Sequence, residues 1–368
     1  MERRGHRRGM GRGGTGSGSS TGNLSGVTTL AGVPYSSRTV DVGGPVHYLD
    51  YGGPECAPLL IGVHGLGGSH LNWAAVAPYL IGRCHLVAVD LLGHGRTPTA
   101  GRSPGVGGHV ELLAGFAAEV SDRPVILMGN SLGGLVAALT ASTAPDRVAG
   151  LILLDPALPT ERLGMVHPRV LFNFVLCSVP GVGERYLSAR RDRTSAEQTV
   201  RRVLRTTCVD PDRVPAEVVD AHIALTEAGD RVAGDRAYLA SARSLSWVMA
   251  RSGPTVARID ALELPVLHLH GERDVLVPLA AARRMAEGRP NWKLEVARDI
   301  GHAPMLETPV WTALRIAEWF DGAGAEAWAR AGGSVDPDPV DPDPVDPDPV
   351  DPDPVDPGPE PEPDPVDH

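Results

Sequence analysis

The chain has 368 residues, of which 42% are hydrophobic, and this length is sufficient for one large α/β domain that carries an insertion. Its formal net charge of −11 is concentrated at the ends: residues 1–26 hold five arginines against one glutamate, and residues 335–368 hold thirteen acidic residues and no lysine or arginine. The nearly neutral part between them excludes a basic nucleic-acid footprint, so we expect no nucleic-acid partner.

The beginning of the chain resembles neither a folded segment nor an export signal. Residues 1–26 are rich in glycine and almost free of large apolar side chains, which predicts disorder. Their arginines are followed by glycine, serine and threonine, whereas a secretory signal requires an apolar stretch, so the sequence favours the cytoplasm. The most apolar run, residues 170–182, is interrupted and shorter than the roughly 20 residues that span a bilayer, so we expect no integral membrane segment.

After this segment, short apolar runs alternate with longer amphipathic ones. This pattern is typical of a mainly parallel, twisted sheet flanked by helices, the α/β class. Most of the runs are continuously apolar, which indicates strands that are buried on both faces. The predicted strands are residues 46–51, 59–63, 86–90, 125–129, 151–155, 266–270 and 293–297. We expect the core to consist of residues 27–157 and 259–325.

The strongest local motif is GNSLG at residues 129–133, between an apolar strand and a run of helix-forming residues. This is the sequence of a nucleophile elbow, a sharp turn that exposes a serine at the start of a helix. The flanking glycines leave room for the close approach of neighbouring segments. We therefore predict that Ser131 is a nucleophile.

A second glycine-rich turn follows the strand at residues 59–63, where the sequence reads HGLGG from His64. Glycines allow such a loop to fold close to a neighbouring site. We predict that the backbone N–H groups of Leu66 and Leu132 form an oxyanion hole, in which each donor stabilises developing negative charge. A purely structural turn is the alternative interpretation.

Residues 158–258 interrupt the alternation of strands and helices. They are rich in arginine, alanine and leucine and contain no convincing strand under period-two counting. We expect a helical lid above the carboxyl ends of the strands, where the ligand sites of α/β proteins form.

A serine hydroxyl is a weak nucleophile near neutral pH and needs a base, which in turn needs an orienting carboxylate. Asp274 and His302 each follow a predicted strand, and the order Ser131, Asp274, His302 is the order expected for this architecture. Asp155 also ends a strand and is the alternative acid. His268 and His270 alternate within a strand, which favours structural roles.

The four cysteines, at positions 56, 84, 177 and 208, include no CxxC pair. This spacing indicates neither a zinc site nor a disulfide framework, so we expect buried free thiols and no metal. At the other end of the chain, VDPDP occurs four times in succession over residues 335–354. Frequent proline and repelling aspartates predict an extended, solvated tail over residues 326–368.

Several motifs together resemble the α/β-hydrolase superfamily. They are HYLDYG at residues 47–52, His64-Gly65, Trp73, residues 90–97, the Ser131 elbow, residues 271–278 and residues 301–307. The resemblance implies acyl transfer to the serine and hydrolysis by a water that the histidine activates, with no cofactor. Relatives that open epoxides or remove halide carry aspartate at the elbow, and Ser131 argues against those reactions. Neither tail belongs to the family pattern.

These features predict a serine hydrolase that cleaves an ester or similar acyl bond of a small to medium apolar substrate. No cluster of arginine or lysine stands beside the motifs, which favours an uncharged acyl group. A carbon–carbon bond hydrolase or a cofactor-free perhydrolase would use the same triad. A ligand receptor on a hydrolase scaffold is the alternative from another class. The sequence does not indicate the oligomeric state.

Overall fold

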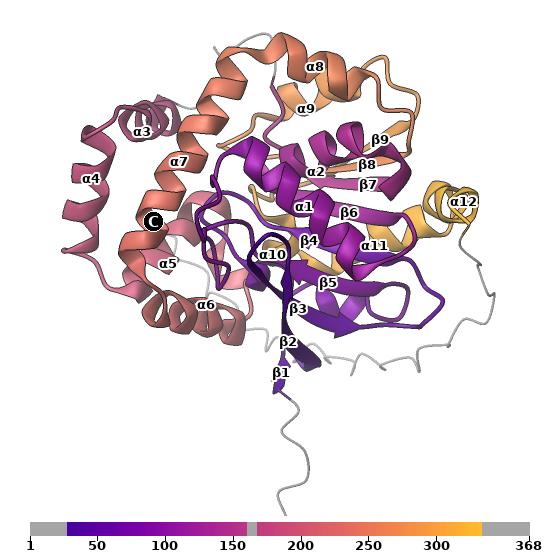
Figure 1. The fold of residues 1–368 in the computed structure, drawn as a ribbon, viewed down its shortest axis with the longest axis horizontal. Helices are drawn as coiled ribbons and strands as arrows, with labels where there is room; N and C mark the ends of the chain where they lie inside the picture. The colour runs from indigo at the N-terminus through magenta and orange to yellow at the C-terminus, as the bar shows by residue number, and fades with distance from the viewer. Residues whose placement is uncertain (1–27, 160–167, 333–368) are drawn as a thin grey trace, which may run out of the picture. The chain divides into compact units, whose positions relative to one another are not determined.

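The computed structural model describes residues 28–159 and 168–332, so the predicted disorder of residues 1–26 and the acidic repeat lie outside the described residues. A nine-stranded sheet runs through the described part in the order β1-β2-β3-β5-β4-β6-β7-β8-β9 (Figure 1). The strands are β1 (Thr28–Leu30), β2 (Val33–Asp41), β3 (Pro45–Gly52), β4 (Leu59–Val63), β5 (His85–Val89), β6 (Val125–Asn130), β7 (Val148–Leu154), β8 (Val266–Gly271) and β9 (Trp292–Ala297).

The sheet is mainly parallel, as predicted. All ladders between β4 and β9 are parallel, and β1, β2 and β3 add an antiparallel edge. The sequence did not predict β1 and β2. Most residues of β2 are polar and exposed, so this strand lacks the continuous apolar run that marks the others.

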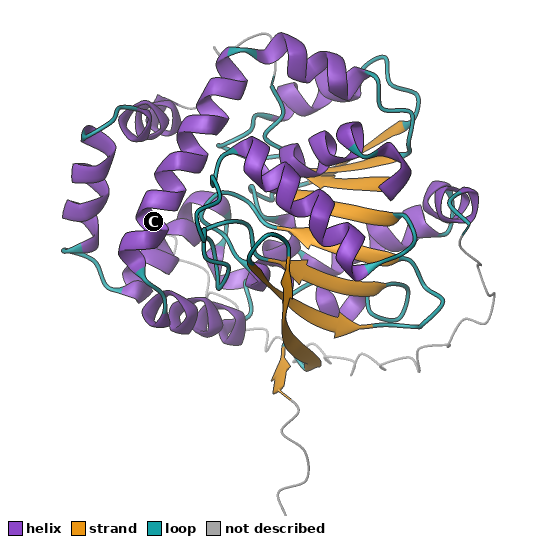
Figure 2. Cartoon of the chain, in the orientation of Figure 1, coloured by secondary structure: helices purple, strands orange, loops and turns teal. Residues whose placement is uncertain are grey.

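Helices cover both faces of the sheet (Figure 2). Successive residues of a strand point to opposite faces. Leu60 and Ile126 pack in one apolar cluster with α10 (Pro304–Glu307) and α11 (Pro309–Phe320). The next residues, Ile61 and Leu127, pack in a second cluster that contains residues from these helices: α1 (Val106–Val120), α2 (Leu132–Thr143) and α9 (Leu279–Ala286). Burial on both faces explains the continuous apolar runs.

The folded core continues past residue 325, where the sequence analysis placed its end. Helix α12 (Ala323–Arg330) packs Ala327 and Trp328 into buried positions. This helix has only eight residues and adjoins the charged tail, so its apolar pattern is too short to predict it from the sequence.

Helices and loops make up the described part of residues 158–258. Residues 168–250 lie together at the left of the sheet in Figure 1, whereas residues 252–260 lie at the top, beside the core. The helices are α3 (Pro168–Ser178), α4 (Val182–Arg191), α5 (Ala196–Thr207), α6 (Ala216–Ala228), α7 (Arg231–Ala250) and α8 (Ser252–Asp260). Among the described residues, no helix is long and apolar enough to cross a membrane. Three cysteines are buried free thiols as expected, but Cys56 is exposed.

Candidate active site

The predicted catalytic residues lie at one edge of the sheet because each follows a parallel strand. Ser131 follows β6, Asp274 follows β8 and His302 follows β9. Neighbouring parallel strands end at the same edge, so residues that are far apart in the sequence come together there.

Ser131 lies on a strained turn between β6 and α2. Its φ of 55° and ψ of −119° fall in a region that residues with a side chain rarely adopt. A Cβ atom at Gly129 would collide with the carbonyl of Gly133, and one at Gly133 would collide with the carbonyl of Val63. The N–H of Ser131 donates to the Leu154 carbonyl at 3.1 Å. The two glycines of the motif therefore permit a turn that the neighbouring strands hold in place.

We expect Gly133→Ala to lower the free energy of unfolding by about 3 kcal/mol or more, because the new methyl group meets backbone atoms of β4 that cannot rotate away. Gly82→Ala is the matched control, since a Cβ atom at Gly82 meets nothing within 4 Å. Urea unfolding followed by circular dichroism measures both substitutions. Equal midpoints for the two variants would show that the close approach at Gly133 is unimportant.

Asp274 and His302 form a buried pair. Nδ1 of His302 lies 2.7 Å from Oδ2 of Asp274, whose Oδ1 accepts the N–H groups of Leu276 at 2.7 Å and Val277 at 3.0 Å. Burial raises the pKa of Asp274, but the charge and hydrogen bond of His302 outweigh this effect and hold the pKa below its usual value. An ionised Asp274 accepts a hydrogen bond from Nδ1–H of His302, which leaves the Nε2 lone pair available as a base.

The backbone of His302 is also fixed on both sides. Its N–H donates to the carbonyl of Thr207, at the end of α5, at 2.5 Å. Its carbonyl accepts Nδ2 of Asn130 at 3.0 Å, and the same amide bonds the Leu154 carbonyl at 3.1 Å. Asn130 therefore links the nucleophile turn to the histidine loop, a role that the sequence analysis missed although Asn130 lies within the GNSLG motif.

Asp155, the alternative acid, is fully buried after β7 with a φ of 44°. Its Oδ1 accepts the N–H of Gly271 at 2.9 Å, and its Oδ2 bonds no described residue. Burial, and then the negative charge of Asp274, raise the pKa of Asp155 well above its usual value. Nδ1 of His302 thus bonds Asp274, whereas the raised pKa of Asp155 favours its protonated form.

Asp155 is expected to make the protein less stable as the pH rises above about 4. The unfolded chain releases the Asp155 proton near its ordinary pKa of 3.8, whereas the folded state retains it. Stability therefore falls between these two pKa values, by at most about 1.4 kcal/mol per pH unit, and the loss is complete above the folded pKa. Asp155→Asn should remove this dependence. Urea unfolding of both proteins at several pH values measures the difference, and parallel profiles would contradict the assignment.

A neutral histidine, His64, fixes the predicted oxyanion loop through hydrogen bonds of both ring nitrogens. Nδ1 of His64 donates to the carbonyl of Gly65 at 2.8 Å, and Nε2 accepts the N–H of Leu91 at 3.0 Å. Burial lowers the pKa of His64 to about 3, which preserves this tautomer. Leu66 follows in the same loop and borders the cavity described below. Leu132 begins α2, so its N–H has no partner within the helix.

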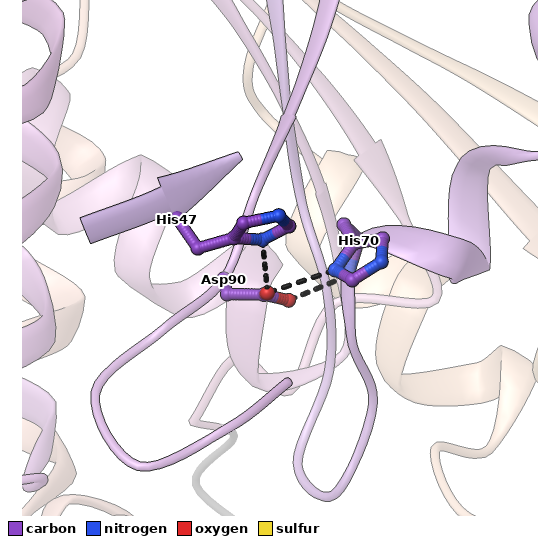
Figure 3. Close-up of side chains that lie close together, drawn as sticks. All are labelled: His47, His70 and Asp90. Carbon is purple, nitrogen blue, oxygen red and sulfur yellow. Dashed lines mark hydrogen bonds and ion pairs between the residues drawn. The ribbon is translucent and has the colours of Figure 1, made fainter. Parts of the chain in front are cut away.

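A second cluster of titratable side chains consists of His47, His70 and Asp90 (Figure 3). Oδ2 of Asp90 accepts Nδ1 of His47 and Nδ1 of His70, both at 2.8 Å, and the N–H of Arg96 at 2.9 Å. These ring and carboxylate atoms are close enough to hold a metal ion. However, a ring nitrogen that donates to a carboxylate carries a proton and offers no lone pair. We interpret the cluster as a hydrogen-bonded junction of β3, η1 (His70–Trp73) and the loop after β5.

A cavity of about 2040 Å³ lies between the carboxyl edge of the sheet and helices α3 to α7. Ser131 and His302 border it from the core, and Phe174 and Met249 border it from the helices. Oγ of Ser131 makes no hydrogen bond with a described residue, so the hydroxyl is available to a ligand. Catalytic hydrogen bonds often tighten only when substrate is bound.

Comparison with known proteins agrees with this geometry. Residues 58–309, more than half of the chain, match the family model of the alpha/beta hydrolase fold. The chain belongs to the α/β-hydrolase fold family. This confirms both the resemblance and the fold class that were inferred from the motifs.

Similar members of the family include enzymes that are named for ester hydrolysis. Lipase LipV of Mycobacterium tuberculosis is 38% identical over 109 residues, which are 30% of this chain and 41% of that protein. Pimeloyl-[acyl-carrier protein] methyl ester esterase of Aromatoleum aromaticum is 29% identical over 258 residues, 68% of this chain and 94% of the esterase. A solved membrane phospholipase A has a TM-score of 0.62 and 27% identity, covering 79% of this chain and 87% of its own.

One cavity residue of this family member could not be predicted from the motifs. Tyr238 of α7 packs against the oxyanion loop, where a Cβ atom at Gly67 would lie 3.3 Å from the tyrosine ring. Burial raises the pKa of Tyr238 to about 12, so its hydroxyl remains protonated. The spacing of residues in the sequence does not indicate that a helix of residues 158–258 contacts the loop after β4.

Proposed function

We propose that the protein is a serine hydrolase that cleaves a carboxylic ester or a similar acyl bond. The observation that carries the proposal is the 2.7 Å contact between Nδ1 of His302 and Oδ2 of Asp274. His302 also borders the same cavity as Ser131. We assign Ser131 as the nucleophile, His302 as the general base and Asp274 as the acid that orients the imidazole.

In this mechanism Oγ of Ser131 attacks the acyl carbon while its proton passes to Nε2 of His302. The N–H groups of Leu66 and Leu132 stabilise the oxyanion of the tetrahedral intermediate. His302 then gives its proton to the departing alcohol, and the acyl group remains on Ser131. Water attacks this acyl enzyme in the same way and releases the acid, so the cycle needs no redox step and no cofactor.

The apolar walls of the cavity support an apolar acyl group, and the names of the relatives support an ester bond. The chain also resembles the fold of haloalkane dehalogenase DbeA from Bradyrhizobium elkani, with a TM-score of 0.69 at 22% identity. Serine at position 131, in place of the aspartate expected for dehalogenation, disfavours that reaction. We further propose that residues 158–258 act as a lid over a core of residues 27–157 and 259–325.

Turnover of p-nitrophenyl esters of increasing chain length tests the proposal. We expect hydrolysis with an optimum chain length that reports the size of the acyl pocket. No hydrolysis of any ester, by protein whose Ser131 still reacts with a fluorophosphonate, would favour a ligand receptor, a carbon–carbon bond hydrolase or a perhydrolase. The cytoplasmic location and the absence of a nucleic-acid partner stay predictions.

A further inference from the structure

The cavity that contains Ser131 carries an excess of positive charge. Among the described residues that border it are seven arginines and two aspartates, with no lysine and no glutamate. The other walls are largely apolar. Cleavage of an uncharged ester would not require this charge, so the partners of each charged side chain decide whether any of it is free to bind a ligand.

Both aspartates are already engaged. Asp235 forms an ion pair with Arg191. The side chain of Asp230 accepts the N–H groups of Val232 at 2.9 Å and Ala233 at 3.0 Å, which caps the start of α7. These two hydrogen bonds, and then the nearby charge of Arg236, lower the pKa of Asp230. Asp230 therefore offsets part of the charge of Arg236, although no ion pair joins the two side chains.

Three more of the arginines bind the protein itself. Arg102 donates to backbone carbonyls, including that of Val42 at 2.9 Å. Arg96 donates to Oγ of Ser37 at 3.2 Å, and Arg231 donates to the carbonyl of Thr194 at 3.2 Å. These contacts, together with the Arg191 ion pair, give four of the seven guanidinium groups a structural partner.

The remaining three are Arg190, Arg202 and Arg236, which we call the cavity arginines. Within residues 28–159 and 168–332 their side chains form no hydrogen bond and no ion pair. Each comes from a different helix, namely α4, α5 and α7. Arg190 is partly buried, Arg202 and Arg236 are exposed, and all three border the same cavity. A solvated charged stripe would instead follow one helix.

Arg190 lies near Tyr238, a residue that contacts the predicted oxyanion loop. Burial raises the pKa of Tyr238, and the positive charge of nearby Arg190 opposes this rise. The ring of Tyr238 in turn packs against Gly67 in the oxyanion loop. Tyr238 is therefore close both to Arg190 and to the loop that would hold the oxyanion.

We propose that the cavity arginines bind a phosphate or carboxylate group on the substrate whose ester is cleaved at Ser131. The substrate is then an anionic amphiphile with an apolar acyl chain. Its negative charge lies either on the alcohol side of the ester bond or at the far end of the acyl chain. Planar guanidinium groups match both anions with paired hydrogen bonds. This inference rests on the proposed ester hydrolysis and revises the expectation of an uncharged substrate, because the folded helices bring together arginines that are scattered in the sequence.

A matched pair of esters tests the phosphate case. 1-Decanoylglycerol 3-phosphate and 1-decanoylglycerol contain the same ester bond and differ in the phosphate. We expect the wild-type protein to hydrolyse the phosphate ester with a kcat/KM at least about tenfold higher. Arg190→Gln, Arg202→Gln and Arg236→Gln should each lower the ratio of the two kcat/KM values by about tenfold, mainly through KM.

Two arginines of the same helices provide controls. Arg185 on α4 and Arg205 on α5 are exposed and do not border the cavity, so Arg185→Gln and Arg205→Gln should preserve the ratio. The preference should also weaken as ionic strength rises from about 10 mM to about 0.5 M, because salt screens charge attraction. An equal loss in the control variants would contradict a defined subsite.

A second pair of probes distinguishes the two anions. The p-nitrophenyl hemiester of sebacic acid carries a free carboxylate, and its methyl ester does not. A preference for the charged member of either pair supports the subsite and identifies its anion. Hydrolysis of the uncharged esters with no preference in either pair would overturn the subsite while leaving the proposed function intact. No hydrolysis of any of the four esters would instead overturn the proposed function.

Discussion

Ser131→Ala is expected to reduce kcat for ester hydrolysis by on the order of 10⁴-fold or more. The alanine removes the only atom that would form the covalent acyl intermediate, and it leaves the turn, the cavity walls and the backbone donors in place. KM should therefore change little. Steady-state kinetics on the best p-nitrophenyl ester measures both constants.

Ser178→Ala is the matched control for this substitution. Ser178 also borders the cavity, but its hydroxyl donates to the carbonyl of Phe174 at 2.7 Å and lies 2.9 Å from Oγ of Ser246. Its loss should affect the packing of α3 and leave kcat within a few-fold of wild type. Comparable losses in the two variants, or substantial activity of Ser131→Ala at unchanged stability, would show that another group attacks the ester.

Asp274→Asn is expected to reduce kcat by roughly 10³- to 10⁴-fold. In the wild-type protein the carboxylate accepts a hydrogen bond from Nδ1–H of His302 and, through Oδ1, hydrogen bonds from the N–H groups of Leu276 and Val277. The amide oxygen can keep the backbone contacts, which turns the amide nitrogen toward the imidazole. Nδ1 must then act as the acceptor, and the proton moves to Nε2, where it blocks general-base catalysis. Circular dichroism verifies that the fold is retained.

Asp155→Asn separates the two candidate acids. Burial and the charge of Asp274 raise the pKa of Asp155 and so favour its neutral form. An amide of the same size should therefore change little, and we expect kcat to fall by less than about tenfold. If Asp155 were the functional acid, the order of the two variants would be reversed. The pair of variants therefore decides which carboxylate orients His302.

The sequence analysis predicted the core of the fold because burial leaves a direct signature in a parallel sheet. Strands that are covered on both faces read as continuous apolar runs, and their order places Ser131, Asp274 and His302 after three of them. The elbow could be recognised because its glycines meet backbone carbonyls that exclude any side chain. Local steric demands of this kind are visible in the sequence.

Other features depend on packing between distant segments, which no spacing in the sequence encodes. The edge strands β1 and β2 are too exposed to show an apolar run, and α12 is too short. The choice between Asp155 and Asp274 required the position of the His302 ring. The cavity arginines belong to three helices of residues 158–258, and the packing of those helices places all three on the border of one cavity. The sequence therefore predicts the reaction centre better than the surroundings that select a substrate.

Mass spectrometry of the full chain after reaction with a fluorophosphonate tests the role of Ser131 most directly. We expect one covalent adduct on the peptide that contains Ser131, no adduct in Ser131→Ala, and much slower labelling of His302→Ala because the base is missing. An adduct on a different residue, or the absence of any adduct on protein that hydrolyses esters, would contradict a Ser131–His302–Asp274 triad.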